Sequence, residues 1–521
     1  DHERRTREIL RQALPGVEVS ISSEVHPEPK EYERASTTVV DAYVKPTATL
    51  YLDKLSSRLA QEGYRHCLLV MLSNGGAATV ETTKHFPVQA VESGPAAGVE
   101  AATHYGNLIG ARRLLSFDMG GTTAKLCVVL DGKAARTRSF EVDRVQRFKP
   151  GSGIPIAVPV YDLLEIGAGG GSIARLNDLK LMEVGPESAS SNPGPACYDR
   201  GGVEPTVTDA DLLLGYLDPA NFLGGAMPLS RAAAEKAMNR AIGEPLGLSA
   251  VQAAWGVHNF VNETMASAAR VHIAEKGQAA RSLTLVGFGG AGPVHAVGLA
   301  RKLGCPQVVI PPLPGVMSAF GLLTTPTAIE RPRAVRQRLD QVDLDALERA
   351  TRELESSAGA LLPQGNPVTF TRTADMWRVG QDYPLEVPVE GAWTDAGARE
   401  RLEAAFNHQY EQHYGRVDDD TPLEVVTVRV KAALENTKPF VHIEGGTLES
   451  SLKGRRAMFV PALQAVREVQ VYDRMRLQPG ARIVGPAIIE ERESTTIIDQ
   501  GDTLTVDNLG CLVIDLATPA A

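Results

Sequence analysis

The sequence is poor in cysteine, and none of its cysteines has the spacing of a metal or redox motif. The five cysteines are scattered over 521 residues, and no two form a CxxC pair: Cys67, Cys127, Cys197, Cys305 and Cys511. An odd number of scattered cysteines indicates neither a disulfide framework nor a thiolate zinc site. We therefore expect all five to be small buried hydrophobic residues.

Long apolar runs and an excess of basic residues are also missing. Residues 67–72 are among the longest apolar stretches, far below the ~20 residues of a membrane-spanning helix. The charged, amphipathic first residues are not typical of a secretory signal. With 53 Lys and Arg against 63 Asp and Glu, the net charge is −10, whereas nucleic-acid binding needs a basic surface. We expect a cytoplasmic protein that binds neither membranes nor nucleic acid.

The composition, with 43% hydrophobic and 22% charged residues, is that of an ordinary globular protein. The chain begins at Asp1 without a methionine, inside an expected helix, so we expect a fragment of a longer protein. Changes in glycine content and in the expected secondary structure predict three domains, over residues 1–110, 111–330 and 331–521. In the first, Thr37–Val44 and Cys67–Leu72 resemble strands, and Thr49–Glu62 resembles a helix.

In residues 331–521 the glycine clusters thin out and alternating strands predominate, so we expect a β-rich α+β domain. Helices are predicted over Leu344–Leu354 and Ala396–His413, and strands over Trp377–Val387, Glu424–Val430, Ile488–Ile498 and Thr503–Ile514.

The glycine-rich turn at residues 118–123 lacks the GK[ST] sequence and the following helix of a P-loop. Two β-prone runs flank it, and the second ends in the hairpin signal Asp131-Gly132. We therefore predict strand–turn–strand, as in the actin, sugar kinase and Hsp70 superfamily. An ordinary tight hairpin is the alternative.

Such a turn is suited to hold phosphates. Gly120 and Gly121 allow positive φ, so that backbone N–H groups face an anion, and Thr122 and Thr123 add hydroxyl donors. Asp118 is suited to hold Mg²⁺ or to orient a water. Lys125 adds a positive charge, although on a strand its side chain can face away from the turn.

A second turn, at residues 287–292, matches GxGxxG but lacks the acidic residue that a dinucleotide site requires. Residues 282–288 are predicted as a strand, Pro293 begins a helix that ends at Gly304, and Gln307–Ile310 forms the next strand. No acidic residue occurs between Gly289 and Glu330, so a nicotinamide cofactor is not expected. The turn can still lie against a purine or a ribose.

Two further features lie in the glycine-rich middle. The dense glycines of residues 165–172 are either a flexible linker or a close backbone approach, and the flanking Leu163, Leu164 and Ile173 argue against a linker. After Leu248 a capping box at Ser249 and Gln252 predicts a long helix that ends at Gly277. His258 falls on its inner face, where we expect a hydrogen-bonded core histidine rather than a ligand.

Together these motifs resemble the hydantoinase/oxoprolinase family, on its ATP-using A-type subunit. The motifs follow one another in order from about residue 30 to the C-terminus: FDMGGTTAK at 117–125, EIGAGGGSIA at 165–174, GPES…NPGPACY at 185–198, PTVTDADLLLGYLDP at 205–219 and GFGGAGPVHA at 287–296.

The resemblance implies an α/β, actin-like (ribonuclease H-like) ATPase fold with two lobes around a nucleotide cleft, followed by the C-terminal domain. Residues 1–110 would be the remainder of the first lobe, and 111–330 the second lobe. Family members usually carry an earlier DxGGTxTD loop, and none precedes Asp118. We therefore expect a truncated N-terminal lobe, which puts ATP turnover by this chain alone in doubt because phosphoryl transfer needs both loops.

The resemblance also implies the site. The turn from Asp118 to Thr123 would be the second phosphate loop, with Asp118, Thr122 and Thr123 as catalytic residues and Asp118 as the Mg²⁺ ligand. The remaining cofactor-binding residues for ATP would be Gly120, Gly121, Lys125, Glu165, Gly169, Gly170, Gly171, Gly287, Gly289, Gly290 and Gly292.

Three functions follow from the resemblance. The first is an ATP-dependent amidohydrolase that opens a hydantoin, 5-oxoproline or another lactam through a phosphorylated intermediate, paired with a B-type hydantoinase subunit. The second is an ATP-dependent ketone carboxylase subunit, as in acetone and acetophenone carboxylases. The third is a non-catalytic nucleotide-binding scaffold subunit. The motifs do not discriminate between the first two.

Overall fold

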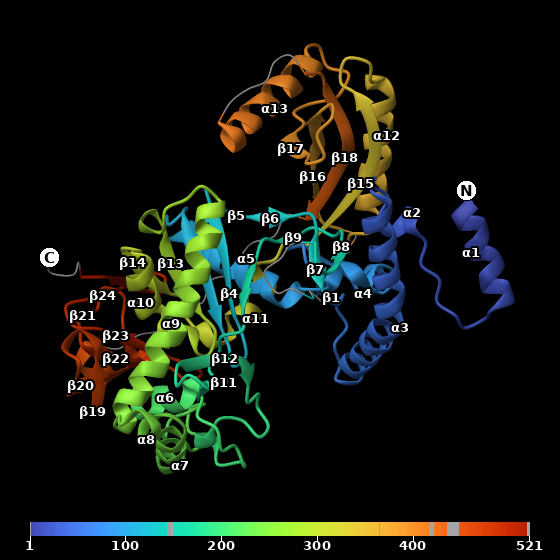
Figure 1. Ribbon diagram of the computed structural model, residues 1–521. Helices are drawn as coiled ribbons and strands as arrows, with labels where there is room; N and C mark the ends of the chain where they lie inside the picture. Colours follow the sequence, from blue (N-terminus) through green and yellow to red (C-terminus); the bar gives the residue numbers. More distant parts are fainter. Residues whose placement is uncertain are drawn as a thin grey trace. The chain divides into compact units, whose positions relative to one another are not determined.

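A computed structural model describes residues 2–142, 145, 151–363, 365–415, 421–434 and 447–517. Its contacts divide the chain into two compact units (Figure 1). Unit 1 comprises residues 1–96, 136–160 and 325–437, and unit 2 comprises residues 97–135, 161–324 and 438–521. The segment 331–521 thus contributes to both units, and the domain boundaries at 110 and 330 stay predictions.

Unit 2 is built on a mixed sheet in which nine of the described strands take part. Its strands β3 and β13, and β13 and β14, are parallel, and its other pairs are antiparallel. In spatial order the strands are β10 (Leu164–Ile166), β4 (Ala124–Leu130), β3 (Leu114–Met119), β13 (Thr284–Phe288), β14 (Gln307–Ile310), β25 (Leu512–Asp515), β24 (Thr503–Val506) and β21 (Arg482–Val484), and β5 (Lys133–Ala134) pairs with β4.

Both faces of the central strands are buried, which explains why they are apolar at successive positions. Leu115, Phe117 and Met119 of β3 share a core with helices α6 (Val207–Leu213), α9 (Ala250–Glu275) and α10 (Gly292–Leu303), which Figure 1 shows beside the sheet. Leu114 belongs to the opposite core, with α5 (Ser93–Leu108) and α11 (Met317–Thr324). The predicted hairpin at residues 114–130, the βαβ unit and the helix after Leu248 are confirmed.

Two predicted strands of unit 2 are hairpins instead. Residues 488–498 form β22 (Ala487–Glu490) and β23 (Thr495–Ile498), and residues 503–514 form β24 and β25. Polar turns, Glu491–Ser494 and Asp507–Gly510, interrupt the apolar alternation and close the backbone, with Glu491 N–H bonding Ser494 C=O at 2.9 Å. β22 and β23 join β19 (Leu452–Val460) and β20 (Ala465–Asp473) in a four-stranded sheet.

Unit 1 contains an antiparallel sheet in the order β15 (Ala328–Arg338), β18 (Leu423–Leu434), β16 (Val368–Arg378) and β17 (Leu385–Pro388). Helices α12 (Leu344–Gly359) and α13 (Ala398–Tyr414) share a core with it around the fully buried Trp393. Both predicted helices and the strand Glu424–Val430 are confirmed. The predicted strand Trp377–Val387 is the end of β16, a turn and the start of β17.

The predicted strand Thr37–Val44 is wrong, because these residues lie in helix α3 (Glu31–Gln61). Their buried positions, Thr37, Asp41 and Lys45, recur every four residues, as on one face of a helix. The run of β-branched residues misled the prediction. In the helix, Thr37 Oγ1 donates to the Glu33 carbonyl at 2.6 Å, which accommodates a residue that otherwise favours strands.

Two predictions from composition have different outcomes. Cys127, Cys197, Cys305 and Cys511 are buried as expected, but Cys67 is exposed, before β1 (Leu69–Met71) rather than inside a strand. In the described part of the chain, every helix is either too short or too polar to cross a membrane.

Replacing Ser249 tests the capping box that begins α9. Ser249 Oγ accepts from the Gln252 N–H at 3.3 Å, and Gln252 Oε1 accepts from the Ser249 N–H at 3.0 Å. Ser249→Ala should destabilise the fold by about 1 kcal/mol, because the Gln252 N–H loses its acceptor. Thermal unfolding beside Ser267→Ala, an exposed position inside the same helix, measures the effect. Equal midpoints for the two variants would contradict it.

Candidate functional site

The predicted phosphate turn joins β3 to β4. Asp118 lies opposite Lys125 in the strand register, and the Gly120 N–H donates to the Thr123 carbonyl at 3.1 Å. Gly121 and Thr122 are exposed, so the outer surface of the turn is accessible. The expectation of positive φ at Gly120 and Gly121 is wrong, because the hairpin closes without a left-handed residue.

The glycines of residues 169–171 lie directly on this turn. The Gly170 and Gly171 N–H groups donate to the Gly120 and Gly121 carbonyls at 3.0 and 2.6 Å. A Cβ atom at Gly169 would lie 2.6 Å from the Thr122 nitrogen. The glycine-rich segment is therefore a close backbone approach and not a linker.

Three charged residues stand in one row across three neighbouring strands. Lys125 on β4 pairs in register with Asp118 on β3 and with Glu165 on β10. The Lys125 Nζ lies 3.5 Å from Glu165 Oε1. Burial raises the pKa of Asp118 above its ordinary value, and the positive charge of Lys125 opposes that shift. The positive charge of Lys125 is therefore partly balanced by the carboxylates of Asp118 and Glu165.

The second turn, residues 287–292, meets the first because β13 lies parallel to β3 with Phe288 beside Asp118. Gly289 has a φ of 87°, and a Cβ there would lie 2.4 Å from the Met119 carbonyl oxygen and 2.5 Å from Asp118 Oδ1. The Ala291 N–H donates to the Met119 carbonyl at 3.0 Å. A side chain at position 289 would therefore collide with the first turn.

The structure brings all predicted site residues together in unit 2. Gly287 serves packing, since its Cβ would lie 2.9 Å from Ala296 and 3.0 Å from Ile310. At Gly292 a Cβ would lie 3.5 Å from the Met119 nitrogen, and at Gly290 it would lie 3.8 Å from the Glu493 carbonyl oxygen.

Sequence reasoning missed the hairpin turn Glu491–Ser494, which also borders the second turn. The carbonyl oxygen of Glu493 is the nearest atom that a Cβ at Gly290 of the second turn would meet. Glu491 is buried, and this burial raises its pKa to about 7. The alternation of residues predicts one strand over Ile488–Ile498, which leaves no place for this polar turn. The four consecutive polar residues of this turn, 491–494, are the sequence signal that indicates it.

Behind the turns, helices α6, α9 and α10 share a buried polar cluster. Its members are Asp211, His258 and His295, which are 3%, 4% and 0% exposed. Asp211 Oδ1 lies 2.7 Å from His258 Nδ1, and Asp211 Oδ2 lies 3.3 Å from His295 Nε2. Burial lowers the pKa of His258. The expectation that His258 is buried and hydrogen-bonded is confirmed, whereas the expectation that it is not a ligand stays a prediction.

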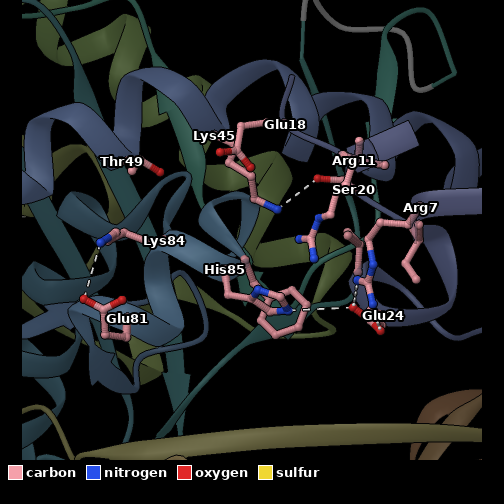
Figure 2. A pocket seen from close by; sticks show the side chains of 14 residues that line it. Arg7, Arg11, Glu18, Ser20, Glu24, Lys45, Thr49, Glu81, Lys84 and His85 are labelled. Carbon is pink, nitrogen blue, oxygen red and sulfur yellow. Dashed lines mark hydrogen bonds and ion pairs between the residues drawn. The ribbon is translucent and has the colours of Figure 1, made fainter. Parts of the chain in front are cut away.

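Unit 1 has a cavity of about 210 Å³ lined by charged side chains (Figure 2). Three of its cations already have acidic partners. Arg7 contacts Glu24 at 2.6 Å, Lys84 contacts Asp53 at 2.8 Å, and Lys45 contacts Asp41 at 3.2 Å. None of the predicted site residues lines this cavity, and we do not assign it a reaction.

Comparison with protein families agrees with the motifs. The Hydantoinase/oxoprolinase family model matches residues 34–331, and the model of the Hydantoinase/oxoprolinase C-terminal domain matches residues 336–514. This chain belongs to the hydantoinase/oxoprolinase family. The resemblance drawn from the motifs is confirmed.

Two relatives of this hydantoinase/oxoprolinase chain match it over nearly its whole length. It is 35% identical to an uncharacterized protein of Methanocaldococcus jannaschii, over 99% of this chain and 75% of that protein. It is 32% identical to caprolactamase subunit alpha of Pseudomonas jessenii, over 97% of this chain and 73% of that subunit.

Two solved structures share the mixed α/β fold. The ATP-dependent caprolactamase of P. jessenii matches with a TM-score of 0.83 and 31% identity, over 99% of this chain and 75% of that chain. A nucleotide-free acetone carboxylase matches with a TM-score of 0.81 and 26% identity, over 99% of this chain and 74% of that chain.

Substitution of two glycines tests the close approach of the turns. Gly289→Ala should lower stability by about 1–3 kcal/mol, because its Cβ meets backbone atoms and its φ is positive. Gly121→Ala is the matched control, since a Cβ there meets no heavy atom within 4 Å. Thermal unfolding of both variants measures the difference. Equal losses would show that the turns are farther apart.

Proposed function

We propose that this chain is the ATP-dependent subunit of an amidohydrolase that opens a cyclic amide. The observation that carries the proposal is the convergence of residues 118–123, 169–171 and 287–292 at the end of β3, beside the carboxylate of Asp118. The relatives named caprolactamase support a lactam as the substrate class.

The residues at this position fit a magnesium nucleotide. Asp118 offers carboxylate oxygen, which Mg²⁺ prefers. Thr122 and Thr123 offer hydroxyl groups, and the exposed part of the turn offers backbone amides to phosphate oxygens. At Gly290 a Cβ would meet no described atom closer than 3.8 Å, so the second turn has space there for a purine or a ribose. Glu165 and Gly169–Gly171 would border the same site.

The chemistry explains why a lactam hydrolase would need ATP. An amide carbon is a poor electrophile, so water attacks it slowly. Attack of the lactam oxygen on the γ-phosphorus forms a C–O–P bond and releases ADP. Water then adds to the activated carbon, and the C–N bond opens to leave an acyl phosphate. A second water attacks the same carbon and releases phosphate with the former carbonyl oxygen. Phosphoryl transfer of this kind depends on positioning and charge neutralisation more than on covalent catalysis.

A ketone carboxylase subunit is the second candidate. The specific observation in its favour is the acetone carboxylase match, whose TM-score of 0.81 is close to that of the caprolactamase. In that reaction ATP would phosphorylate an enolate or bicarbonate. A B-type subunit would be the partner in the hydrolase. Cytoplasmic location remains part of the proposal.

An ATPase screen tests these functions against one another. The full-length chain with its partner subunit is incubated with lactams, hydantoins or ketones, each with and without bicarbonate. ATP consumption with a lactam alone supports the hydrolase, whereas consumption that needs a ketone and bicarbonate supports the carboxylase. Binding of MgATP without turnover on any substrate would favour the scaffold subunit.

Asp118→Asn tests the role of the carboxylate. We expect kcat for ATP turnover to fall by about 10²-fold or more, because a Mg²⁺ ligand or water-orienting group is lost. Asp178→Asn, at an exposed turn of unit 2, is the control and should keep full activity. Near-wild-type turnover by Asp118→Asn would remove Asp118 from the mechanism.

An isotope experiment tests the phosphorylated intermediate. A lactam labelled with ¹⁸O in its carbonyl should transfer the label to inorganic phosphate, because the C–O–P oxygen leaves with phosphorus. Mass spectrometry of the phosphate measures the transfer. Unlabelled phosphate, with all label in the ring-opened product, would exclude the departure of phosphate together with the former carbonyl oxygen.

A further inference from the structure

The buried cluster of Asp211, His258 and His295 gathers three electron-pair donors at one point. One atom from each residue, a carboxylate oxygen or a ring nitrogen, lies within 4.8 Å of the others. The three residues come from α6, α9 and α10, which are separate in the sequence. All three are almost fully buried, and a charged carboxylate in such surroundings requires a counter-charge.

The hydrogen bonds fix which ring nitrogen of His295 is free. Its Nδ1 lies 2.8 Å from the side-chain oxygen of Asn262. An amide oxygen only accepts, so Nδ1 carries the hydrogen, and in the neutral ring Nε2 presents a lone pair. This Nε2 has no hydrogen-bond partner among the described residues, yet it lies 3.3 Å from Asp211 Oδ2.

Two electron-rich atoms therefore face each other in a buried space. A cation bound by both removes their repulsion. In metal sites the ligating histidine usually donates its other ring N–H to an oxygen acceptor, as His295 does to Asn262. His258, stacked on His295 with ring centroids 4.4 Å apart, adds a second imidazole.

We propose that Asp211, His258 and His295 bind a divalent transition-metal ion. Two imidazole nitrogens with one carboxylate match Zn²⁺ best, whereas Mg²⁺ and Ca²⁺ prefer oxygen ligands. Water can fill a fourth position. Tyr216, whose ring meets His258 edge-on at 5.2 Å, has a buried hydroxyl without a described partner that can bond this water.

Such an ion would stabilise the helices behind the candidate nucleotide site. Helix α10 begins at Gly292, at the end of the second glycine turn, and Thr208 of α6 donates to the Gly170 carbonyl at 2.8 Å. The ion would thus link α10, which follows the second turn, to α6, which is bonded to Gly170. It is separate from the Mg²⁺ proposed at Asp118, and its presence does not depend on the reaction.

Metal analysis of the full-length chain, freed of any affinity tag, tests the proposal. The protein is loaded with Zn²⁺, dialysed against metal-free buffer and measured by plasma mass spectrometry. We expect about one tightly held ion per chain. His295→Gln and Asp211→Asn should lose it. His272→Gln, a buried histidine of the same helix α9 outside the cluster, should retain it.

Two measurements on the wild-type chain test the metal site even where a variant does not fold. A strong chelator should lower the thermal midpoint, and added Zn²⁺ should restore it. Titration with Co²⁺ should produce saturable visible absorption bands. Absence of these bands, an unchanged midpoint with chelator, or equal metal in wild type and His295→Gln would overturn the proposal.

Discussion

The parallel pairing of β3 with β13 is the constraint on which the candidate site depends. Because parallel neighbours end at the same edge of a sheet, the turns that follow Met119 and Phe288 emerge side by side. The distance between them is so short that a Cβ at Gly289 would lie 2.5 Å from Asp118 Oδ1. The sheet therefore fixes where the carboxylate of Asp118 stands relative to the second turn.

This arrangement explains which parts of the site were predictable. The turns at 118–123 and 287–292 have strong local signals, namely paired glycines between β-prone runs and a helix that begins with proline. Local signals determine hairpins and βαβ units, so the sequence predicts both turns together with the strands and the helix that flank them. The same reasoning allowed positive φ at Gly120 and Gly121, which they do not adopt, and the facing Gly169 and Gly171 bear the steric demand instead.

What escaped prediction depends on contacts between distant residues. Whether residues 488–498 form one strand or a hairpin is decided by their pairing in register, Glu490 with Thr495, and not by apolar alternation alone. Asp211 and His258 are 47 positions apart, and nothing local to either predicts their contact. Thr37–Val44 shows the opposite error, in which local β-propensity was overruled by a helix face buried at Thr37, Asp41 and Lys45.

Charge balance at the end of β3 limits how the site can hold an anion. Asp118 and Glu165 flank Lys125, whose ammonium group lies 3.5 Å from Glu165, so this row of side chains has a net negative charge. A triphosphate adds further negative charge beside it. Backbone amides carry only partial positive charge, so they cannot offset both. A divalent cation beside Asp118 would supply the missing positive charge, and for this reason we propose the magnesium complex, rather than the free nucleotide, as the form that these residues bind.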